Sequence, residues 1–501
     1  MGQQGNLTAG QPPGTTQPPA LHLLRARDIA KLISSGMLSA VDLIDYLVKR
    51  INTIDPYLGA MVDVDLDGAL AQAEQADQLA AAGSRLPLLG VPFTVKDNLW
   101  VEQRPATCGS KLFADFIAPQ DSWSVTRLKA AGAICIGTTN CSEFGCKGVT
   151  SNLVHGVTRN PWCLDLTPGG SSGGAVASVA AGFSPIALST DAGGSTRRPA
   201  AHTGLIGFKC TSGLIPNPWG FDEPCRDMGS IGVLARDVID CAAMMDVLAG
   251  YDPRDPLSHP LPTEMTLPSA FTRAVINTPD KSLRIAWSLD LGCGFAVDND
   301  VASEMLLAVA QLRSAGWKID DASPHWSNDV ISYPYAVRQQ AELATLFGTK
   351  WHDDPAQFDP VIAAQIQNGL AITATELADV TFRRHRARAQ LTAFFECYDL
   401  LLCPTVPVEP WPCDSLAPGT INGQSADPRA HAVFTPLFNL CDVPALSVPC
   451  GFGARGLPVA LQVVGPRYTD LHVLQFGAEI EHLLSRDFNA PMMRTNIFEQ
   501  V

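Results

Sequence analysis

Two serines in glycine-rich surroundings have the residue types that nucleophilic catalysis needs. Ser171 lies in GGSSGG, residues 169–174, and Ser195 follows Gly193 and Gly194 in DAGGSTRRPA. Glycine has no Cβ, so such runs let backbone amides converge on one point and stabilise a developing oxyanion. A serine hydroxyl is a weak nucleophile until a base takes its proton. The segment therefore predicts serine chemistry with a base nearby in the fold.

Two residues are candidates for that base. His202 follows Ser195 by seven residues, and Lys96 ends the apolar run GVPFTVK. Lysine acts as a base only where burial or neighbouring positive charge lowers its pKa, and the end of an apolar strand is a place for such burial. A lone histidine is equally typical of a structural position. The residues alone leave both candidates open.

The run around Ser171 also has other interpretations. GGSSG has the form G-x-S-x-G of an esterase nucleophile elbow, which requires a strand just before it. The preceding RNPWCLDLTP contains two prolines and is a poor strand. A phosphate-binding loop would need GxGxxG or GxxxxGK[ST], and neither is present. A flexible linker is disfavoured because helix-compatible AVASVAAG follows at once.

Helical and strand-like patterns alternate along the chain. Helical patterns at 21–36, 39–56 and 66–83 precede the first clear strand at 88–98, with Ser39 as N-cap and Pro56 as stop. Further strand patterns follow at 133–140, 184–190, 203–210, 283–292, 398–412 and 438–453. This alternation predicts an α/β fold with a largely buried sheet. Residues 251–279 read as a surface connection, and 323–384 as a mostly helical, substrate-shaping insertion.

Charge and composition restrict the partners. The 501 residues are 46% hydrophobic with a net charge of -15, typical of a globular protein without a polyanion-binding surface. The basic cluster RRHRAR, residues 383–388, is interpreted as one solvated helix face. We expect no direct contact with nucleic acid. No segment approaches the ~20 continuous apolar residues of a membrane span.

The cysteines and the N-terminus suggest a reducing compartment. The 14 cysteines form no CxxC pair or zinc-ligand spacing, so we interpret them as buried free thiols and expect no metal site. MGQQGNLTAGQPPGTTQPPA does not resemble a secretory signal. We therefore expect a cytoplasmic protein with a disordered tail at 1–20.

Several long motifs resemble the amidase signature family. They are LLGVPFTVKDNLWVEQRPATCGS, GVTRNPWCLDLTPGGSSGGAVASVAAG, LSTDAGGSTRRPAAHTGLIGFKCTSG, LRIAWSLDLG and VPALSVPCGFGARGLPVALQVVGP. Their order also matches, from about Leu21 to Leu484. The resemblance implies a large central mixed β-sheet surrounded by helices, in one compact domain over 21–490. Residues 251–400 would be its variable substrate-shaping region, and 491–501 a C-terminal tail.

The resemblance also assigns roles. Ser195 matches the nucleophile, Ser171 the bridging serine on a cis peptide bond, and Lys96 the terminal base. The oxyanion hole would consist of the N–H groups of Ala192, Gly193, Gly194 and Ser195. No metal or organic cofactor is implied.

The remaining residues of these motifs have supporting or open roles. Ser172, Asp191 and Arg197 match structural positions, and Arg197 is expected to pair with charge near the turn. His202, Cys108 and Cys141 become packing residues. Arg198, three residues after the nucleophile, is a candidate clamp for a substrate carboxylate. Gly145, in TNCSEFG, is the other expected substrate contact.

These roles predict a free-standing amidase that cleaves a small or medium amide with water through an acyl-enzyme. Through Arg198 it would prefer acidic or polar substrates. Esters and carbamates suit the same chemistry. Two alternatives stay open: the glutaminase subunit of a tRNA-dependent amidotransferase, and a catalytically silent scaffold or binding protein. Each of these interpretations is compatible with a homodimer.

Overall fold

The fold is built on one mixed sheet. The computed structural model describes residues 20–331 and 334–495. Its main sheet has 11 strands in the order β1-β3-β2-β6-β8-β7-β14-β15-β11-β9-β10. In chain order these are β1 (Met61–Val64), β2 (Pro92–Lys96), β3 (Ile134–Thr139), β6 (Ile186–Asp191), β7 (Ile206–Lys209), β8 (Ser230–Ala235), β9 (Ile285–Trp287), β10 (Ile319–Asp321), β11 (Leu400–Pro404), β14 (Ala445–Phe452) and β15 (Pro458–Val464). The expected mixed sheet is confirmed.

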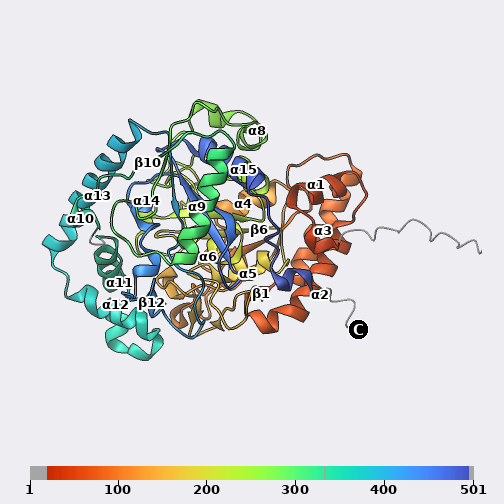
Figure 1. Ribbon diagram of the computed structural model, residues 1–501. Helices are drawn as coiled ribbons and strands as arrows, with labels where there is room; N and C mark the ends of the chain where they lie inside the picture. Colours follow the sequence, from red (N-terminus) through yellow and green to blue (C-terminus); the bar gives the residue numbers. More distant parts are fainter. Residues whose placement is uncertain (1–19, 332–333, 496–501) are drawn as a thin grey trace, which may run out of the picture.

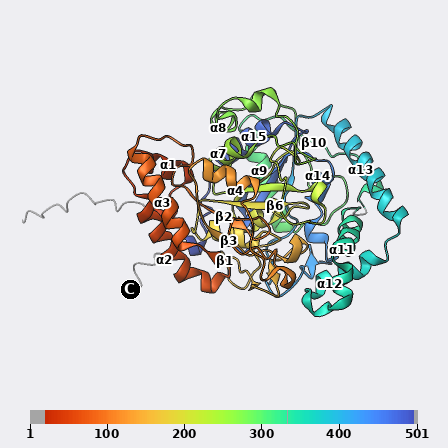
Figure 2. The ribbon, with the colours of Figure 1, turned by 180° about the vertical axis from the view of Figure 1, so that it is seen from behind.

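Helices cover the sheet on both faces and at both ends (Figures 1 and 2). They are α1 (Ala26–Ser34), α2 (Ala40–Leu58), α3 (Leu66–Ala81), α4 (Trp123–Ala130), α5 (Gly173–Ala180), α6 (Arg197–Thr203), α7 (Val238–Leu248), α8 (Ala270–Ile276), α9 (Asn299–Ser314), α10 (Asn328–Ile331), α11 (Pro334–Asp353), α12 (Pro360–Leu370), α13 (Ala374–Phe395), α14 (Pro436–Leu440) and α15 (Asp470–Leu483). Helices α1 to α3 lie at one end of the molecule and α10 to α13 at the opposite end (Figures 1 and 2).

The strand order brings the predicted catalytic segments together. Strand β2 runs parallel to both β3 and β6, and Val95 pairs with Leu188. Carboxyl ends of parallel strands meet at one sheet edge, where α/β proteins bind ligands. Lys96, the last residue of β2, therefore lies beside the end of β6 that leads to Ser195.

The N-terminal helices form largely as their caps predict. Ser39 caps α2 by accepting a hydrogen bond from the Asp42 N–H at 3.3 Å. The expectation that Pro56 stops this helix is wrong, because α2 continues to Leu58. Pro56 lies in the last turn, and Gly59, with φ of 61°, ends the helix by donating to the Asp55 carbonyl.

A short strand at the sheet edge was missed. Strand β1 lies between α2 and α3 and pairs antiparallel with β3. Its four residues, MVDV, are all half-buried, so they lack the alternating burial that marks a strand in a sequence.

Three further expectations need correction. The supposed connection 251–279 contains helix α8. Residues 491–495 of the expected C-terminal tail pack on the domain, because Arg50 donates to the carbonyls of Met492 and Thr495. In the basic cluster on α13, Arg384 is buried and pairs with Asp227 and Asp442, because these carboxylates replace water around its charge.

Other expectations agree with the structure or concern residues outside the described ranges. The region 323–384 is mostly helical, as predicted. The 14 cysteines, all in the described part of the chain, are free thiols and most are buried. Within residues 20–331 and 334–495, no helix has both the length and the apolarity that a membrane crossing needs. The expected disordered tail, except Ala20, lies outside the described residues.

Candidate active site

Ser195 lies on the tight turn between β6 and α6. The strand ends at Asp191, and α6 begins at Arg197. The turn is compact because Gly194 has φ of 107°, a conformation that favours glycine. Ser195 is 7% exposed and lines a cleft that Ser171 also lines. A short turn at a strand end thus presents the hydroxyl to a cleft.

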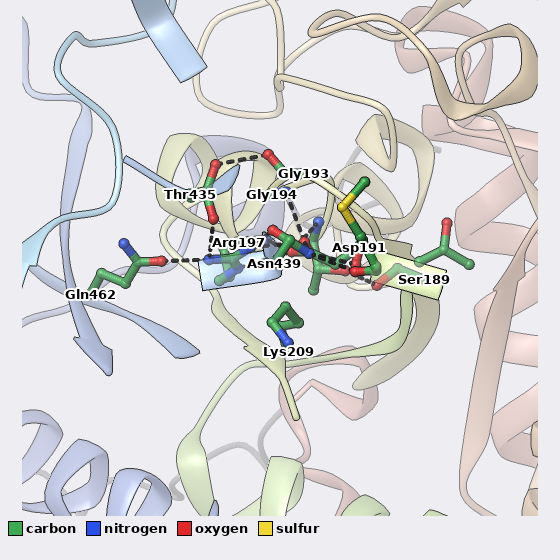
Figure 3. Close-up of polar contacts among 12 residues, drawn as sticks. Ser189, Asp191, Gly193, Gly194, Arg197, Lys209, Thr435, Asn439 and Gln462 are labelled. Carbon is green, nitrogen blue, oxygen red and sulfur yellow. Dashed lines mark hydrogen bonds and ion pairs between the residues drawn. The ribbon is translucent and has the colours of Figure 1, made fainter. Parts of the chain in front are cut away.

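A buried ion pair holds this turn (Figure 3). Arg197 Nη2 and Nε donate to the two carboxylate oxygens of Asp191 at 2.9 and 3.0 Å. Arg197 also donates to Gln462 Oε1 at 2.7 Å and Asn439 Oδ1 at 2.6 Å. Both charged side chains are fully buried. The pairing expected for Arg197 is present, and its acid is Asp191.

This pair also fixes the charge state of Asp191. Burial by itself would raise the pKa of the Asp191 carboxyl, but the ion pair and hydrogen bonds with Arg197 outweigh burial and hold that pKa well below its usual range. The ionised carboxylate accepts the backbone N–H of Gly194 at 2.7 Å and of Thr196 at 3.2 Å. Asp191 thereby ties together the residues on both sides of Ser195.

Lys96 and Ser171 form the expected contact. The Lys96 Nζ lies 2.8 Å from the Ser171 Oγ and 2.8 Å from the Thr190 Oγ1. Ser171 precedes α5, and the peptide bond between Gly170 and Ser171 is cis. Ser172 donates to the Thr190 carbonyl at 3.4 Å, which links this loop to β6. Within residues 20–331 and 334–495, no hydrogen bond joins Ser171 to Ser195, although both line the cleft.

Lys96 has the environment of a lysine that loses its proton easily. It is fully buried, and burial lowers its pKa because an ammonium ion is poorly solvated there. Glu223 and Asp191 act in the opposite direction, but burial outweighs them. Burial therefore shifts Lys96 toward the neutral form that a base requires.

Three of the four predicted oxyanion donors are available. In the described part of the chain, no group accepts a hydrogen bond from the N–H of Ala192, Gly193 or Ser195. The Gly194 N–H differs, since it donates to the Asp191 carboxylate at 2.7 Å. Gly194 therefore shapes the turn, and its inclusion among the oxyanion donors is corrected.

Of the two expected substrate contacts, one lines the cleft and the other does not. Gly145 lines the cleft, and a Cβ on it would lie 3.4 Å from Ser171 Oγ. Arg198 is nearly buried, and its Nη1 lies 3.4 Å from the Nδ1 of His431. The residues that line the cleft with Ser195 do not include Arg198.

The helical region contributes side chains to the cleft and to its surroundings. Tyr335 on α11 lines the cleft and lies against Gly193, where a Cβ would come within 2.9 Å of its ring. Asp359, just before α12, pairs with Lys147, and its N–H donates to Glu143. These contacts hold the segment that carries Gly145.

Packing residues behave as the motifs predict. His202 is buried, and burial with the nearby Arg198 lowers its pKa to about 3, so it is neutral. It packs edge-on against Trp411. Burial raises the pKa of the Cys108 and Cys141 thiols well above the usual value, which disfavours the reactive thiolate.

Asn98 and Glu223 are among the polar cleft residues that were missed in the sequence. Asn98 donates from Nδ2 to Thr190 Oγ1 at 3.0 Å and to Glu223 Oε1 at 2.6 Å. Its position two residues after Lys96, in KDN, was an available signal. Glu223 lies in a loop between β7 and β8 that carries no motif, so only the fold reveals it.

Comparison with known proteins identifies the family of this chain. The family model described as Amidase matches residues 42–474. The chain belongs to the amidase family. Among curated members, it is 33% identical over 473 residues to an acylamidase of Rhodococcus erythropolis, covering 92% of this chain and 95% of that protein. It is 34% identical over 484 residues to a glutamyl-tRNA(Gln) amidotransferase subunit of Roseiflexus sp. (strain RS-1), covering 91% and 96%.

Solved structures of amidases share the fold. A bacterial aryl acylamidase of the amidase signature enzymes superposes with a TM-score of 0.85 at 26% identity, over 95% of this chain and 100% of that one. The structure of 6-aminohexanoate cyclic dimer hydrolase with substrate gives a TM-score of 0.84 at 26% identity and the same coverage. This amidase is therefore an amide-hydrolysing enzyme.

Proposed function

We propose that this amidase cleaves the C–N bond of a small or medium amide through an acyl-enzyme on Ser195. Ser195 Oγ attacks the carbonyl carbon, its proton passes to Ser171, and the Ser171 proton passes to neutral Lys96. The carbonyl oxygen becomes an oxyanion that the N–H groups of Ala192, Gly193 and Ser195 stabilise. Removing one such donor in other hydrolases costs about 2.7 to 4 kcal/mol.

The second half of the cycle reverses the proton path. As the tetrahedral intermediate collapses, the C–N bond breaks and the leaving amine takes the proton that Lys96 returns through Ser171. Water then attacks the acyl carbon and gives its proton to the same relay. The bond from that carbon to Ser195 Oγ breaks, the relay returns the proton to Ser195 Oγ, and the acid leaves. Esters and carbamates fit these steps, since the same attack and collapse accept other leaving groups and other carbonyl groups.

The observation that carries the proposal is the buried contact between Lys96 and Ser171. The 2.8 Å distance joins a base of lowered pKa to a hydroxyl that lines the same cleft as Ser195. The missing hydrogen bond from Ser195 to Ser171 does not oppose the relay, because such bonds often tighten only when substrate is present.

A preference for acidic or polar acyl groups through Arg198 is a finer part of the proposal. Its place on α6, three residues after Ser195, supports it. The contact of its guanidinium with His431, outside the residues that line the cleft, weighs against it.

Intact-mass measurement after an activated fluorophosphonate tests the nucleophile. We expect one adduct on the wild type and none on Ser195→Ala. Ser230→Ala is a matched control, because Ser230 also lines the cleft and should leave labelling intact. An adduct that survives Ser195→Ala but is lost in Ser171→Ala would instead support the nucleophile elbow at Ser171.

The glutaminase subunit is the second candidate, because relatives such as the Roseiflexus protein bear the name of an amidotransferase component. A free-standing amidase hydrolyses amides when purified alone, whereas a subunit requires its partner. Multiple turnover by the pure chain would therefore exclude the subunit. Absence of both turnover and Ser195 labelling would support a silent scaffold.

A further inference from the structure

Glu223 places a carboxylate in the wall of the catalytic cleft. It lines the cleft with Ser171 and Ser195, and it also lines the shallow depression just outside. The residue therefore lies at the cleft mouth. Glu223 belongs to the loop between β7 and β8, which carries no sequence motif, so only the fold shows that this residue lies in the cleft wall.

One oxygen of the Glu223 carboxylate is linked to Lys96 through hydrogen bonds of two intervening side chains. Glu223 Oε1 accepts from Asn98 Nδ2 at 2.6 Å, and the same Nδ2 donates to Thr190 Oγ1 at 3.0 Å. Thr190 Oγ1 in turn lies 2.8 Å from Lys96 Nζ. This chain of hydrogen bonds fixes the position of Glu223 relative to the reacting groups.

The other oxygen is open. Within the described ranges, Glu223 Oε2 has no hydrogen-bond partner, and it is not among the buried polar atoms that lack one, so solvent reaches it. Nor does the described part of the chain contain a salt bridge to Glu223. The neighbouring Arg226 donates instead to the carbonyls of Asn217 and Phe221.

The other acidic side chains in the cleft wall are already occupied. Asp191 is paired with Arg197, and the two oxygens of Asp255 accept the N–H groups of Asn217 and Leu257. Glu223 is thus the one carboxylate among the described lining residues with an oxygen available to a ligand.

We propose that Glu223 selects amide substrates that carry an ammonium group, by accepting a hydrogen bond from that group at the cleft mouth. The inference rests on the proposed function and names its substrate class. A carboxylate held by Asn98 loses little freedom when it binds a cation, so the contact is stronger than that of two mobile surface side chains. The same charge repels anionic groups at this position.

The test compares three matched p-nitroanilides with acyl chains of equal length that end in an ammonium, a methyl or a carboxylate group. Two or three chain lengths cover the unknown reach to Glu223. For the best length we expect the wild-type kcat/KM to be about tenfold higher for the ammonium substrate than for the methyl one, the size of one charge-assisted hydrogen bond. In Glu223→Gln, which keeps an acceptor for Asn98, that ratio should fall close to one.

Asp222→Asn is the matched control. Asp222 is exposed, lines only the outer depression, and carries the same charge one residue away. The ratio should survive this substitution. A wild type without the preference, a preference that persists in Glu223→Gln, or an equal loss in Asp222→Asn would each overturn the inference.

A binding measurement separates this inference from the proposed function. In the Ser195→Ala protein, calorimetry compares hexylammonium with hexanol, with and without Glu223→Gln. Glu223-dependent binding of hexylammonium by the Ser195→Ala protein, together with a wild type that forms no acyl-enzyme on Ser195, would support the ammonium site and refute the proposed mechanism. Turnover of amides without any Glu223-dependent preference or binding would refute the ammonium site alone.

Discussion

Replacing Arg197 with methionine should cost this amidase a large part of its stability. The guanidinium donates five hydrogen bonds, to Asp191, Asn439, Gln462 and the Thr435 carbonyl, and it is fully buried. Methionine fills similar space but leaves the Asp191 carboxylate buried without its cation. Breaking a buried pair in this way costs about 3 to 5 kcal/mol. Asp191 keeps the Gly194, Thr196 and Asn439 donors, so we expect about 3 kcal/mol, the lower end.

The pH dependence of this loss is the sharper part of the prediction. In the wild type the pKa of Asp191 is lower in the folded than in the unfolded protein. The ionised carboxylate therefore contributes fully to the free energy of unfolding above the unfolded pKa of ~3.9, and this contribution is lost only as the pH falls further. Without Arg197, burial raises the folded pKa of Asp191 above the unfolded one. Protonation then removes the cost of the lone charge, and the deficit relative to the wild type shrinks as the pH falls.

Urea unfolding, followed by tryptophan fluorescence at pH 8 and pH 5, measures both effects. Adding Asp191→Asn to Arg197→Met should recover part of the lost stability, because the lone charge is removed. Arg284→Met is the control, since its pair with Asp399 is exposed and its loss should change the stability little. A loss below about 1 kcal/mol for Arg197→Met, a loss equal at both pH values, or no recovery in the double variant would refute the reasoning.

Three further predictions concern catalysis. Because burial lowers the pKa of Lys96 and the neutral amine is the base, kcat/KM should rise with pH through that pKa. Lys96→Ala should lower kcat by about 10² to 10⁴ and abolish this rise. A rise that survives in the variant would belong to another group. Gly194→Ala should inactivate the enzyme and lower its Tm, because the residue has φ of 107° and the new Cβ would lie 2.0 Å from Thr435 Oγ1; full activity in a steady-state assay would contradict this. If Arg198 binds a substrate carboxylate, Arg198→Leu should reduce kcat/KM for the anionic p-nitroanilide about tenfold more than for the neutral one. Equal losses for the two substrates would instead support a structural role for Arg198 beside His431.

Local sequence largely determined which segments carry the chemistry. Glycine runs fix the turns before Ser171 and Ser195, because few other residues adopt those backbone conformations. The apolar run before Lys96 predicted a buried strand, and β2 is fully buried. The resemblance of the motifs added the pairing of Ser171 with Lys96, and the two side chains are in contact.

The tertiary structure decided which groups those segments meet. Arg197 also donates to Gln462 and Asn439, which lie more than 200 residues later in the chain, and no spacing in DAGGSTRR encodes those partners. Arg197 and Arg198 are adjacent in the chain, yet the helix directs one to Asp191 and the other to His431.

Long-range contacts explain the remaining gap. Glu223 lies 127 residues after Lys96 in the chain, and their shared network exists only because Asn98, two residues beyond β2, lies beside Thr190 of the neighbouring strand β6. Sequence periodicity indicates which face of a helix or strand is buried, and it carries no information on a contact with a distant segment. The sequence by itself therefore determined which residues are proposed to react in this amidase, while only the fold decided the charge and shape of the cleft that they line.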